Sequence, residues 1–264
     1  MKLSKDQIKR HNQAVDYLNK DELTFDEKLF VFENWNEGAT NINSSAGAFF
    51  TPWGLARDFS IELWDNAKTV DLCAGIGMLS FVAYHYKSCT DITCVEINQQ
   101  YIEVGKKMLP EAKWIQGSVM DKNLIESLGN FKQAISNPPF GNIKHNEKVD
   151  GWLQYTGQKF DLKTIEVASK ISENGLFILP QMSTPFRYSG SRDGTILDIE
   201  NLPNGLKSFV EKTGIQFEFN CGIDTSFYLD DWKGVKPLCE IALFDFTNCT
   251  KKSTTNIQPT LFEL

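Results

Sequence analysis

The sequence predicts an α/β protein built on one mostly parallel sheet of seven strands. From residue 69 onward, short apolar runs rich in β-branched residues alternate with amphipathic stretches, a pattern typical of parallel strands joined by helices. A pair of glycines follows the first run, where a helix is predicted to begin, as at ligand-binding turns of open α/β sheets. The 264 residues suffice for a full core, and contents of 41% hydrophobic and 23% charged residues are typical of a globular protein.

The apolar runs define the strands in chain order. The predicted strands are Thr69–Cys73, Ile92–Glu96, Ala112–Ile115, Gln133–Ser136, Gly175–Pro180, Ile215–Cys221 and Leu238–Phe246. Only a loop, residues 222–237, separates the last two, so we expect them to pair as an antiparallel hairpin.

Amphipathic stretches between the strands predict the helices that cover the sheet. These helices are Met78–Tyr86, Gln99–Leu109, Leu124–Leu128, Leu162–Ile171 and Leu206–Lys212. Two further helical patterns, Ser4–Asn19 and Thr24–Trp35, precede a Gly- and Asn-rich loop at 38–47. We therefore expect a helical extension over 1–46, a main domain over 47–247 and a polar tail over 248–264.

Composition limits the classes of function. No apolar run is long enough to cross a bilayer, and the first residues lack the apolar core of a signal peptide, so we expect a cytoplasmic protein. The six cysteines form no C-x-x-C pair and the chain has three histidines, so we expect neither a metal site nor a disulfide framework. A net charge of −7 argues against a sequence-blind nucleic-acid coat but allows a local basic cleft.

The stretch Ser136-Asn137-Pro138-Pro139-Phe140-Gly141 has the chemistry of a loop that grips a planar nitrogen base. The prolines lack N–H groups, so carbonyls here remain free to accept hydrogen bonds from a ligand, and Asn137 adds a side-chain acceptor. Two acceptors on an exocyclic amine would make its nitrogen nucleophilic, while Phe140 would stack on the ring. The alternative is an ordinary strand-ending turn with a buried Phe.

A second motif, Asp71-Leu72-Cys73-Ala74-Gly75-Ile76-Gly77, joins the first predicted strand to a helix. Glycines at this turn let the backbone approach a bound adenosyl group without a Cβ clash. The next strand ends in Glu96, where a carboxylate can accept hydrogen bonds from ribose hydroxyls. The alternative for Glu96 is a carboxylate that stabilises a helix N-terminus.

These motifs, in this order, resemble those of S-adenosylmethionine-dependent adenine amino methyltransferases that act on DNA. Residues 47–52 resemble the N-terminal cofactor segment of that family, Asp71 to Gly77 its glycine loop, Glu96 its ribose-binding acid and Asn137–Phe140 its catalytic tetrapeptide. The resemblance covers about residues 47 to 180 well and the rest thinly. It implies a Rossmann-like class I methyltransferase fold with S-adenosylmethionine as cofactor.

The resemblance also implies which residues hold the cofactor. Phe50, Thr51 and Pro52 would lie against its methionine part, and Asp71 would hold the amino group through backbone or water contacts. The third-strand motif, usually Gly-Asp, is Gly117-Ser118 here, so either Ser118 or Asp121 would contact the adenine. The full implied set is Phe50, Thr51, Pro52, Asp71, Cys73, Gly75, Gly77, Glu96, Ile97, Ser118, Val119, Asp121 and Asn137.

Methyl transfer from a sulfonium is an in-line displacement, for which positioning and desolvation suffice without a strong base or a metal. We therefore predict that the catalytic residues are Asn137, Pro138, Pro139 and Phe140. None of the cysteines has the Pro-Cys setting of a ring-carbon methyltransferase.

Basic residues interleaved with aromatic ones after the catalytic loop predict contacts to phosphates and bases. The candidate nucleic-acid contacts are Lys144, Lys148, Trp152, Tyr155, Lys159, Arg187 and Arg192. The alternative is a solvated loop anchored by one or two aromatic side chains. After residue 180 too little chain remains for a separate recognition domain of ~100 residues, so we expect a short or degenerate recognition sequence.

The function predicted from the sequence is methylation of adenine amino groups in double- or single-stranded DNA, by a solitary or phage-type modification enzyme. Three alternatives stay open: the same chemistry on structured RNA, methylation of a protein glutamine, and a non-catalytic subunit of a modification complex that binds cofactor or nucleic acid. Relatives that modify glutamine usually carry Tyr where Phe140 stands. The oligomeric state stays open as well.

Overall fold

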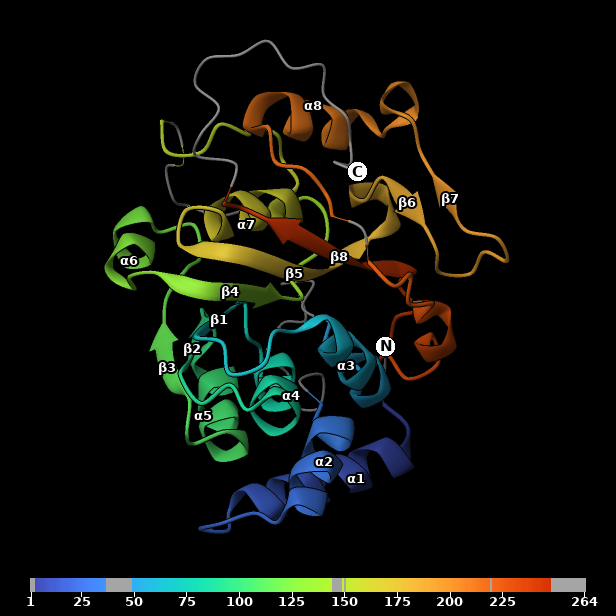
Figure 1. Cartoon of the computed structure of the whole chain (residues 1–264). Helices are drawn as coiled ribbons and strands as arrows, with labels where there is room; N and C mark the ends of the chain where they lie inside the picture. The colour runs from blue at the N-terminus through green and yellow to red at the C-terminus, as the bar shows by residue number, and fades with distance from the viewer. Residues whose placement is uncertain (1–2, 37–48, 144–148, 150, 219, 248–264) are drawn as a thin grey trace.

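A computed structural model describes residues 3–36, 49–143, 149, 151–218 and 220–247 (Figure 1). The predicted loop at 38–47 and the predicted tail at 248–264 lie outside these residues. The helices are α1 (Lys5–Leu18), α2 (Phe25–Asn34), α3 (Trp53–Phe59), α4 (Met78–Lys87), α5 (Gln99–Met108), α6 (Lys122–Ser127), α7 (Phe160–Ala168) and α8 (Asn204–Thr213). Helix α3 is the one that the sequence pattern did not predict.

The central sheet has six strands in the order β3-β2-β1-β4-β5-β8. Its strands are β1 (Thr69–Leu72), β2 (Ile92–Glu96), β3 (Lys113–Gln116), β4 (Phe131–Ser136), β5 (Ser172–Pro180) and β8 (Cys239–Asp245). All neighbours run parallel except β8, which pairs antiparallel with β5 from Asn174↔Asp245 to Pro180↔Cys239. The predicted mostly parallel α/β sheet is therefore confirmed.

The predicted seventh strand, Ile215–Cys221, is wrong. The described residues of this segment make one antiparallel bridge to β8, where the Glu218 amide donates to the Leu243 carbonyl at 2.8 Å. Two residues further on, the side-chain amide of Asn220 donates to the Ile241 carbonyl at 2.7 Å. In a continuous β-ladder a backbone amide would make that hydrogen bond. The apolar alternation is nevertheless real, since Ile215 and Phe217 are buried.

A small antiparallel pair was not predicted from the sequence. Strands β6 (Phe186–Arg187) and β7 (Thr195–Ile196) form it beyond the end of β5. Buried Glu240 on β8 holds this region to the sheet, because its carboxylate accepts hydrogen bonds from the Tyr188 and Ser189 amides and from Gln181 Nε2.

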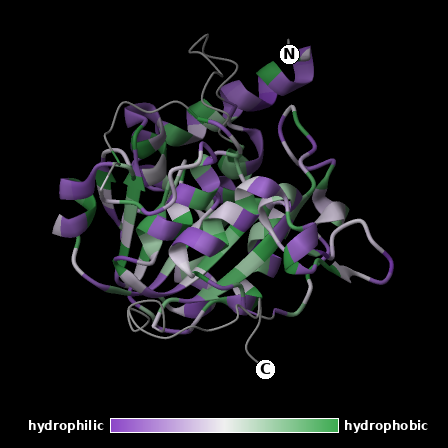
Figure 2. Ribbon diagram, turned by 90° about the horizontal axis from the view of Figure 1, so that it is seen from above, coloured by the Kyte–Doolittle hydropathy of each residue, from purple (hydrophilic) through white to green (hydrophobic). Residues whose placement is uncertain are grey.

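The sheet separates two apolar cores. Helices α3, α4 and α5 cover one face and α7 and α8 cover the other, while α1 and α2 pack outside the first layer (Figure 1). The apolar strands lie inside and polar helix faces point outward (Figure 2). This layering leaves the carboxyl ends of β1, β2 and β4 uncovered by helices, which is where α/β sheets bind ligands.

The N-terminal helices are strongly defined by their caps. Ser4 and Thr24 each accept a hydrogen bond from the amide three residues on, and Gln7 and Glu27 reach back to the cap amides, which completes two capping boxes. Helix α2 packs on α4 through Phe32 and Phe81, whose ring centroids are 5.1 Å apart. Among the described helices, none is both long and apolar enough to cross a membrane.

Candidate active site

A cavity of about 330 Å³ opens at the carboxyl ends of β1, β2 and β4. The glycine loop, the end of β2, the turn after β3, the segment before α3 and the loop after β4 all contribute to its wall. The lining residues are Phe49, Phe50, Thr51, Asp71, Cys73, Ala74, Gly75, Ile76, Met78, Leu79, Val95, Glu96, Ile97, Asn98, Tyr101, Gly117, Ser118, Val119, Asn137, Pro139, Ile143 and Phe160.

The glycine loop turns sharply into α4. Cys73, Gly75 and Gly77 all have positive φ angles, and Gly77 begins α4 in the left-handed region at φ 90°. A Cβ on Gly77 would also meet the Trp114 ring at 3.0 Å. Glycine at this position therefore satisfies both the backbone conformation and the close approach of Trp114.

Glu96 holds the two loops that flank the cavity. Its Oε2 accepts a hydrogen bond from the Gly75 amide at 2.8 Å, and its Oε1 accepts one from the Asn98 amide at 2.8 Å. The cap of α5 is Asn98, whose own Oδ1 accepts from the Gln100 amide, so Glu96 is not the capping group of that helix. The carboxylate is buried and lines the cavity, a position compatible with ribose recognition.

Asp71 is a buried carboxylate with one unsatisfied oxygen. Its Oδ2 accepts from the Ser80 hydroxyl at 2.7 Å, whereas its Oδ1 is buried without a hydrogen-bond partner. Burial raises the pKa of Asp71 to about 7, and the negative charge of Glu96 adds to the shift. An unsatisfied acceptor of this kind on the cavity wall suits a cationic amino group of a ligand.

The nearby thiol of Cys73 is not an activated nucleophile. Burial raises the pKa of the Cys73 thiol well above its usual value, and the charges of Glu96 and Asp71 raise it further. A reactive cysteine needs the opposite shift. Among the described residues, no group of three or more His, Cys, Asp or Glu side chains is arranged to hold a metal ion.

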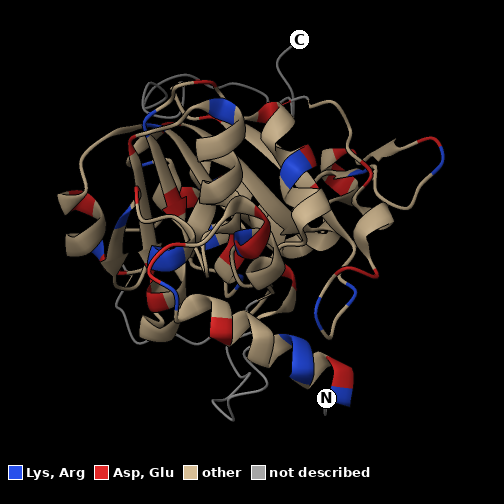
Figure 3. Cartoon of the chain, turned by 90° about the horizontal axis from the view of Figure 1, so that it is seen from below, with Lys and Arg blue, Asp and Glu red and all other residues tan. Residues whose placement is uncertain are grey.

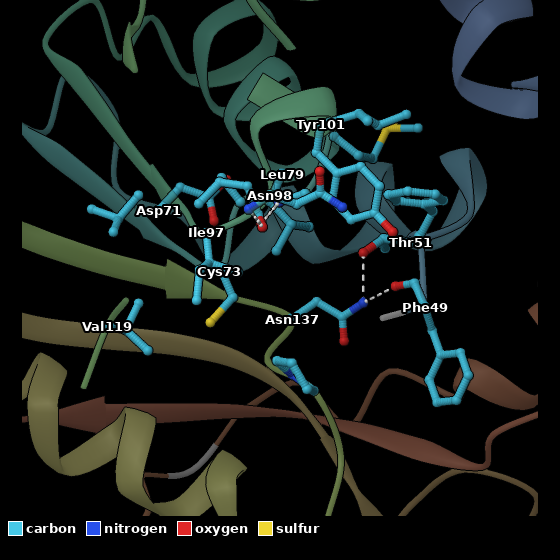
Figure 4. A pocket seen from close by; sticks show the side chains of 18 of the residues that line it. Phe49, Thr51, Asp71, Cys73, Leu79, Ile97, Asn98, Tyr101, Val119 and Asn137 are labelled. Atoms are coloured by element: carbon cyan, nitrogen blue, oxygen red, sulfur yellow. Dashed lines mark hydrogen bonds between the residues drawn. The ribbon is translucent and has the colours of Figure 1, made fainter. Parts of the chain in front are cut away.

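Asn137 follows β4 and is fixed in one orientation (Figure 4). Its Nδ2 donates to the Phe49 carbonyl at 2.8 Å and to Thr51 Oγ1 at 3.0 Å. Its Oδ1 is buried and has no hydrogen-bond partner. The arrangement leaves the acceptor of the amide available inside a cavity that Asn137 and Pro139 line together.

Phe140 lies in the loop after β4 and contacts the segment before α3. Its ring meets the Phe49 ring edge-on, with centroids 5.9 Å apart and planes at 65°. Phe140 is partly exposed, and it does not line the cavity itself, whereas Phe49 does. Pro138 also lies outside the lining set, so the tetrapeptide presents Asn137 and Pro139 to the cavity.

The structure separates the two candidates for the adenine contact. Ser118 lines the cavity beside Val119, and its Oγ accepts from the Met120 amide at 3.1 Å. Asp121 instead caps α6, with Oδ1 accepting from the amides of Asn123 and Leu124. The cavity therefore favours Ser118.

Two other predicted cofactor residues flank the cavity without lining it. Pro52 is the cap residue of α3 and Gly77 that of α4. The remaining predicted positions, from Phe50 and Thr51 to Ile97 and Asn137, are brought together on its wall.

The predicted nucleic-acid contacts are only partly available. Tyr155 is 2% exposed and packs edge-on against Phe209 at 5.5 Å, so burial in the core excludes its predicted stacking role. Lys159 Nζ donates to the Met182 carbonyl at 2.7 Å and to Ser183 Oγ at 3.2 Å. Its ammonium is thus bound by the protein rather than free for phosphate.

The remaining candidate nucleic-acid contacts also differ in whether their side chains are held by the protein. Arg187 Nη1 donates to the carbonyls of Thr184 and Phe186, and Trp152 is partly buried against the core. Arg192 is exposed. Lys144 and Lys148 lie outside the described residues.

Eleven of the lining residues lie outside the predicted set of site residues, among them Phe49, Tyr101 and Phe160. Phe49 precedes a predicted contact and could have been found from that motif, whereas Tyr101 lies on α5 and Phe160 begins α7. The Phe160 amide donates to the Gly141 carbonyl at 2.7 Å, a long-range contact without a local sequence signal.

Comparisons with known proteins agree with this architecture. Residues 55–152 match the family model described as methyltransferase small domain. A search of curated protein sequences gives no significant match.

Solved structures match over most of the chain at low identity. The modification subunit of a candidate type I restriction enzyme from Vibrio vulnificus has a TM-score of 0.56 at 10% identity, covering 87% of this chain and 51% of that one. A candidate RNA methyltransferase from Pyrococcus horikoshii has a TM-score of 0.48 at 16% identity, covering 84% and 98%. A methyltransferase from Pyrococcus furiosus has a TM-score of 0.45 at 16% identity, covering 78% and 88%.

The sheet order and these matches define the class: the chain has the Rossmann-like methyltransferase fold. The findings support methyltransferase activity. The names of the matched structures point to different targets, RNA for one and a restriction system for another, and at these identities neither target transfers to this chain.

Proposed function

We propose that this protein transfers a methyl group from S-adenosylmethionine to the exocyclic amino group of adenine in DNA. The observation that carries the proposal is the orientation of Asn137. Because Nδ2 is held by Phe49 and Thr51, the free Oδ1 is the atom left to accept a hydrogen from a target amine.

The donor set of the cavity fits S-adenosylmethionine. Asp71 Oδ1 is an unsatisfied acceptor for an ammonium group, Glu96 provides carboxylate oxygens beside the glycine loop, and Ser118 and Val119 form a small wall opposite. The lining is mainly apolar, with aromatic rings from Phe50 and Tyr101. The bound cofactor would supply an electrophilic methyl group on its sulfonium.

The residues of the loop would act on the amine. Asn137 Oδ1 and the Pro138 carbonyl would each accept one amine hydrogen, which directs the nitrogen lone pair toward the methyl carbon. Phe140 and Phe49 would hold the base after it leaves the stack, a contact worth about 1–3 kcal/mol per base. The proton released after transfer would pass to water, since positioning rather than a strong base supplies most of the acceleration.

The proposal is tested by incubating the protein with tritiated S-adenosylmethionine and four acceptors side by side: duplex DNA, single-stranded DNA, RNA and total protein. We expect label in DNA, recovered as N6-methyladenine after digestion to nucleosides. Label in RNA alone would support methyl transfer to a nucleic acid but show that the acceptor is RNA rather than DNA. Label in protein alone, or cofactor binding without any transfer, would contradict the proposal.

We expect Asn137→Ala to lower transfer by about 100-fold or more, the scale for losing one hydrogen bond made in the transition state. Cofactor affinity should stay within a few fold, because the amide acts on the target amine. The matched control is Asn142→Ala, which removes an exposed amide from the same loop. Near wild-type turnover by folded Asn137→Ala would show that the catalytic assignment is wrong.

A further inference from the structure

The side chain of Asn137 joins the loop after β4 to the segment before α3 by hydrogen bonds. Phe49 and Thr51 are separated from Asn137 by 88 and 86 residues, and both accept a hydrogen bond from its Nδ2. Thr51 is 7% exposed, so water has little access to compete for this bond. The same three-residue segment carries Phe50, which lines the cavity.

We propose that Thr51 is a positioning residue that, together with the Phe49 carbonyl, holds the Asn137 amide in its catalytic orientation. The inference rests on the proposed role of Asn137 Oδ1 as acceptor for the target amine. Thr51 was expected only to lie against the methionine part of the cofactor, and this role is additional to that contact.

Selection is needed because the two ends of an amide are nearly equal in size and shape, so packing alone does not distinguish them. The Phe49 carbonyl can only accept a hydrogen bond, so the end of the amide facing it must be the nitrogen. A flipped Asn137 would turn its oxygen toward that carbonyl and its N–H groups toward an amine that also donates. The flipped amide would therefore offer the target amine no hydrogen-bond acceptor.

Thr51 secures the orientation that the Phe49 carbonyl selects, because it supplies the second acceptor for Nδ2. The Phe49 carbonyl engages one hydrogen of Nδ2 and Thr51 Oγ1 engages the other, so neither N–H remains to compete for an incoming base. Valine at this position would keep the branched shape of threonine and remove the acceptor. One buried N–H would then lose its partner, and the amide would become freer to rotate.

The matched control lies at the opposite end of the same sheet. Thr69 begins β1, is fully buried, and its Oγ1 accepts from the side-chain amide of Gln133 at 2.9 Å. Thr69→Val therefore removes the same kind of hydrogen bond, from a side-chain amide to a threonine hydroxyl, together with the bond that Oγ1 donates to the Ala67 carbonyl, without touching the cavity.

The experiment compares steady-state transfer by Thr51→Val, Thr51→Ser and Thr69→Val on the best nucleic-acid acceptor. We expect Thr51→Val to lower kcat about tenfold with the KM for the cofactor unchanged within about twofold, because the lost hydrogen bond acts on the reacting amine. Thr51→Ser should restore most of kcat, and Thr69→Val should leave it unchanged. An unchanged kcat for Thr51→Val, or an equal loss for Thr69→Val, would overturn the proposal.

A second readout does not depend on activity. The Nδ2 hydrogens of Asn137, assigned in an amide NMR spectrum by their loss in Asn137→Ala, should exchange with water at least about tenfold faster in Thr51→Val than in the wild type. Equal exchange rates would overturn the positioning role. If the wild type methylates no acceptor, the proposed function fails, and the exchange rates still decide whether Thr51 fixes the amide.

Discussion

At the scale of single residues, the cavity holds two carboxylates in opposite environments. Both oxygens of Glu96 accept hydrogen bonds from backbone amides. Asp71 has one unsatisfied buried oxygen, and burial raises its pKa to about 7. Carboxylates whose environments differ in this way commonly have different tasks. We propose that Glu96 would bind the ribose hydroxyls and Asp71 a cationic group of the cofactor.

We expect Glu96→Ala to weaken cofactor binding by one to two orders of magnitude, on the order of 1.5–3 kcal/mol, because hydrogen bonds to a charged group are lost and the Gly75 loop loses its anchor. Calorimetric titration with S-adenosylmethionine measures this. Glu173→Ala, which removes an exposed carboxylate paired with Lys132, serves as the control. Unchanged affinity in Glu96→Ala would make Glu96 a purely structural group.

The raised pKa of Asp71 should appear as a pH dependence of stability. Between its unfolded value of 3.8 and about 7, the folded protein keeps a proton that the unfolded chain has lost. This group therefore lowers the free energy of unfolding as the pH rises through that window, by up to about 3 kcal/mol between pH 5 and 7, and adds no slope above it. Urea unfolding of the wild type and Asp71→Asn at several pH values measures the difference. Parallel profiles for the two proteins would contradict the assignment.

At the scale of elements, a partly buried lysine connects the N-terminal helices to the cavity wall. Lys233 lies in the loop before β8, and its Nζ donates to the carbonyls of Phe32 and Trp35 at 2.6 and 2.7 Å, at the end of α2. The same ammonium lies 5.6 Å from the centroid of the Phe50 ring, which lines the cavity. The end of α2, the loop before β8 and the cofactor segment thus meet at one side chain.

We expect Lys233→Met to destabilise the protein by about 1–3 kcal/mol, because two carbonyls lose their donor. Burial lowers the pKa of Lys233 to about 7, although the charge of Glu33 opposes the shift. The unfolded chain binds more protons between pH 7 and 10.5, so this group makes the wild type more stable as the pH rises through that window.

The cost of Lys233→Met should therefore be larger at about pH 9 than at about pH 6. Thermal or urea unfolding at the two pH values measures it. Exposed Lys236, in the same loop, provides the control variant Lys236→Met, for which we expect little change. Equal costs for the two variants would refute the role of the buried ammonium.

At the scale of the whole molecule, the charge distribution does not favour binding dominated by phosphate contacts. The net charge is −7, and on the described residues the two signs are interspersed (Figure 3). Of the basic residues predicted to contact phosphate, Lys159 and Arg187 are bound by protein carbonyls, and Arg192 is exposed. Recognition of a base by the loop should therefore contribute more to affinity than the sequence suggested.

We expect a shallow salt dependence of DNA binding. Even if Lys144, Lys148 and Arg192 all contact phosphates, the slope of log K against log salt should be no steeper than about −3. Fluorescence anisotropy titrations over a range of salt concentrations measure the slope. A slope of about −6 or steeper would indicate a basic surface that these residues do not account for.

The sequence predicted most of the elements because their signals are local. Strand β2 matches its predicted bounds, and α4 and α5 end within a residue of theirs. The order of Asp71, Glu96 and Asn137 also predicted one site, since the carboxyl ends of parallel strands share an edge of the sheet. All three line the same cavity.

Features that depend on residues distant in the sequence could be decided only by the tertiary structure. The strand predicted at Ile215–Cys221 has the right alternation, yet its pairing depends on β8 and reduces to a single bridge. Tyr155 has the composition of a surface cluster and is instead buried against α8. The sequence by itself determined that an amide stands at position 137, whereas the direction of its oxygen is set by Phe49 and Thr51, because hydrogen bonds between segments more than 80 residues apart leave no local pattern.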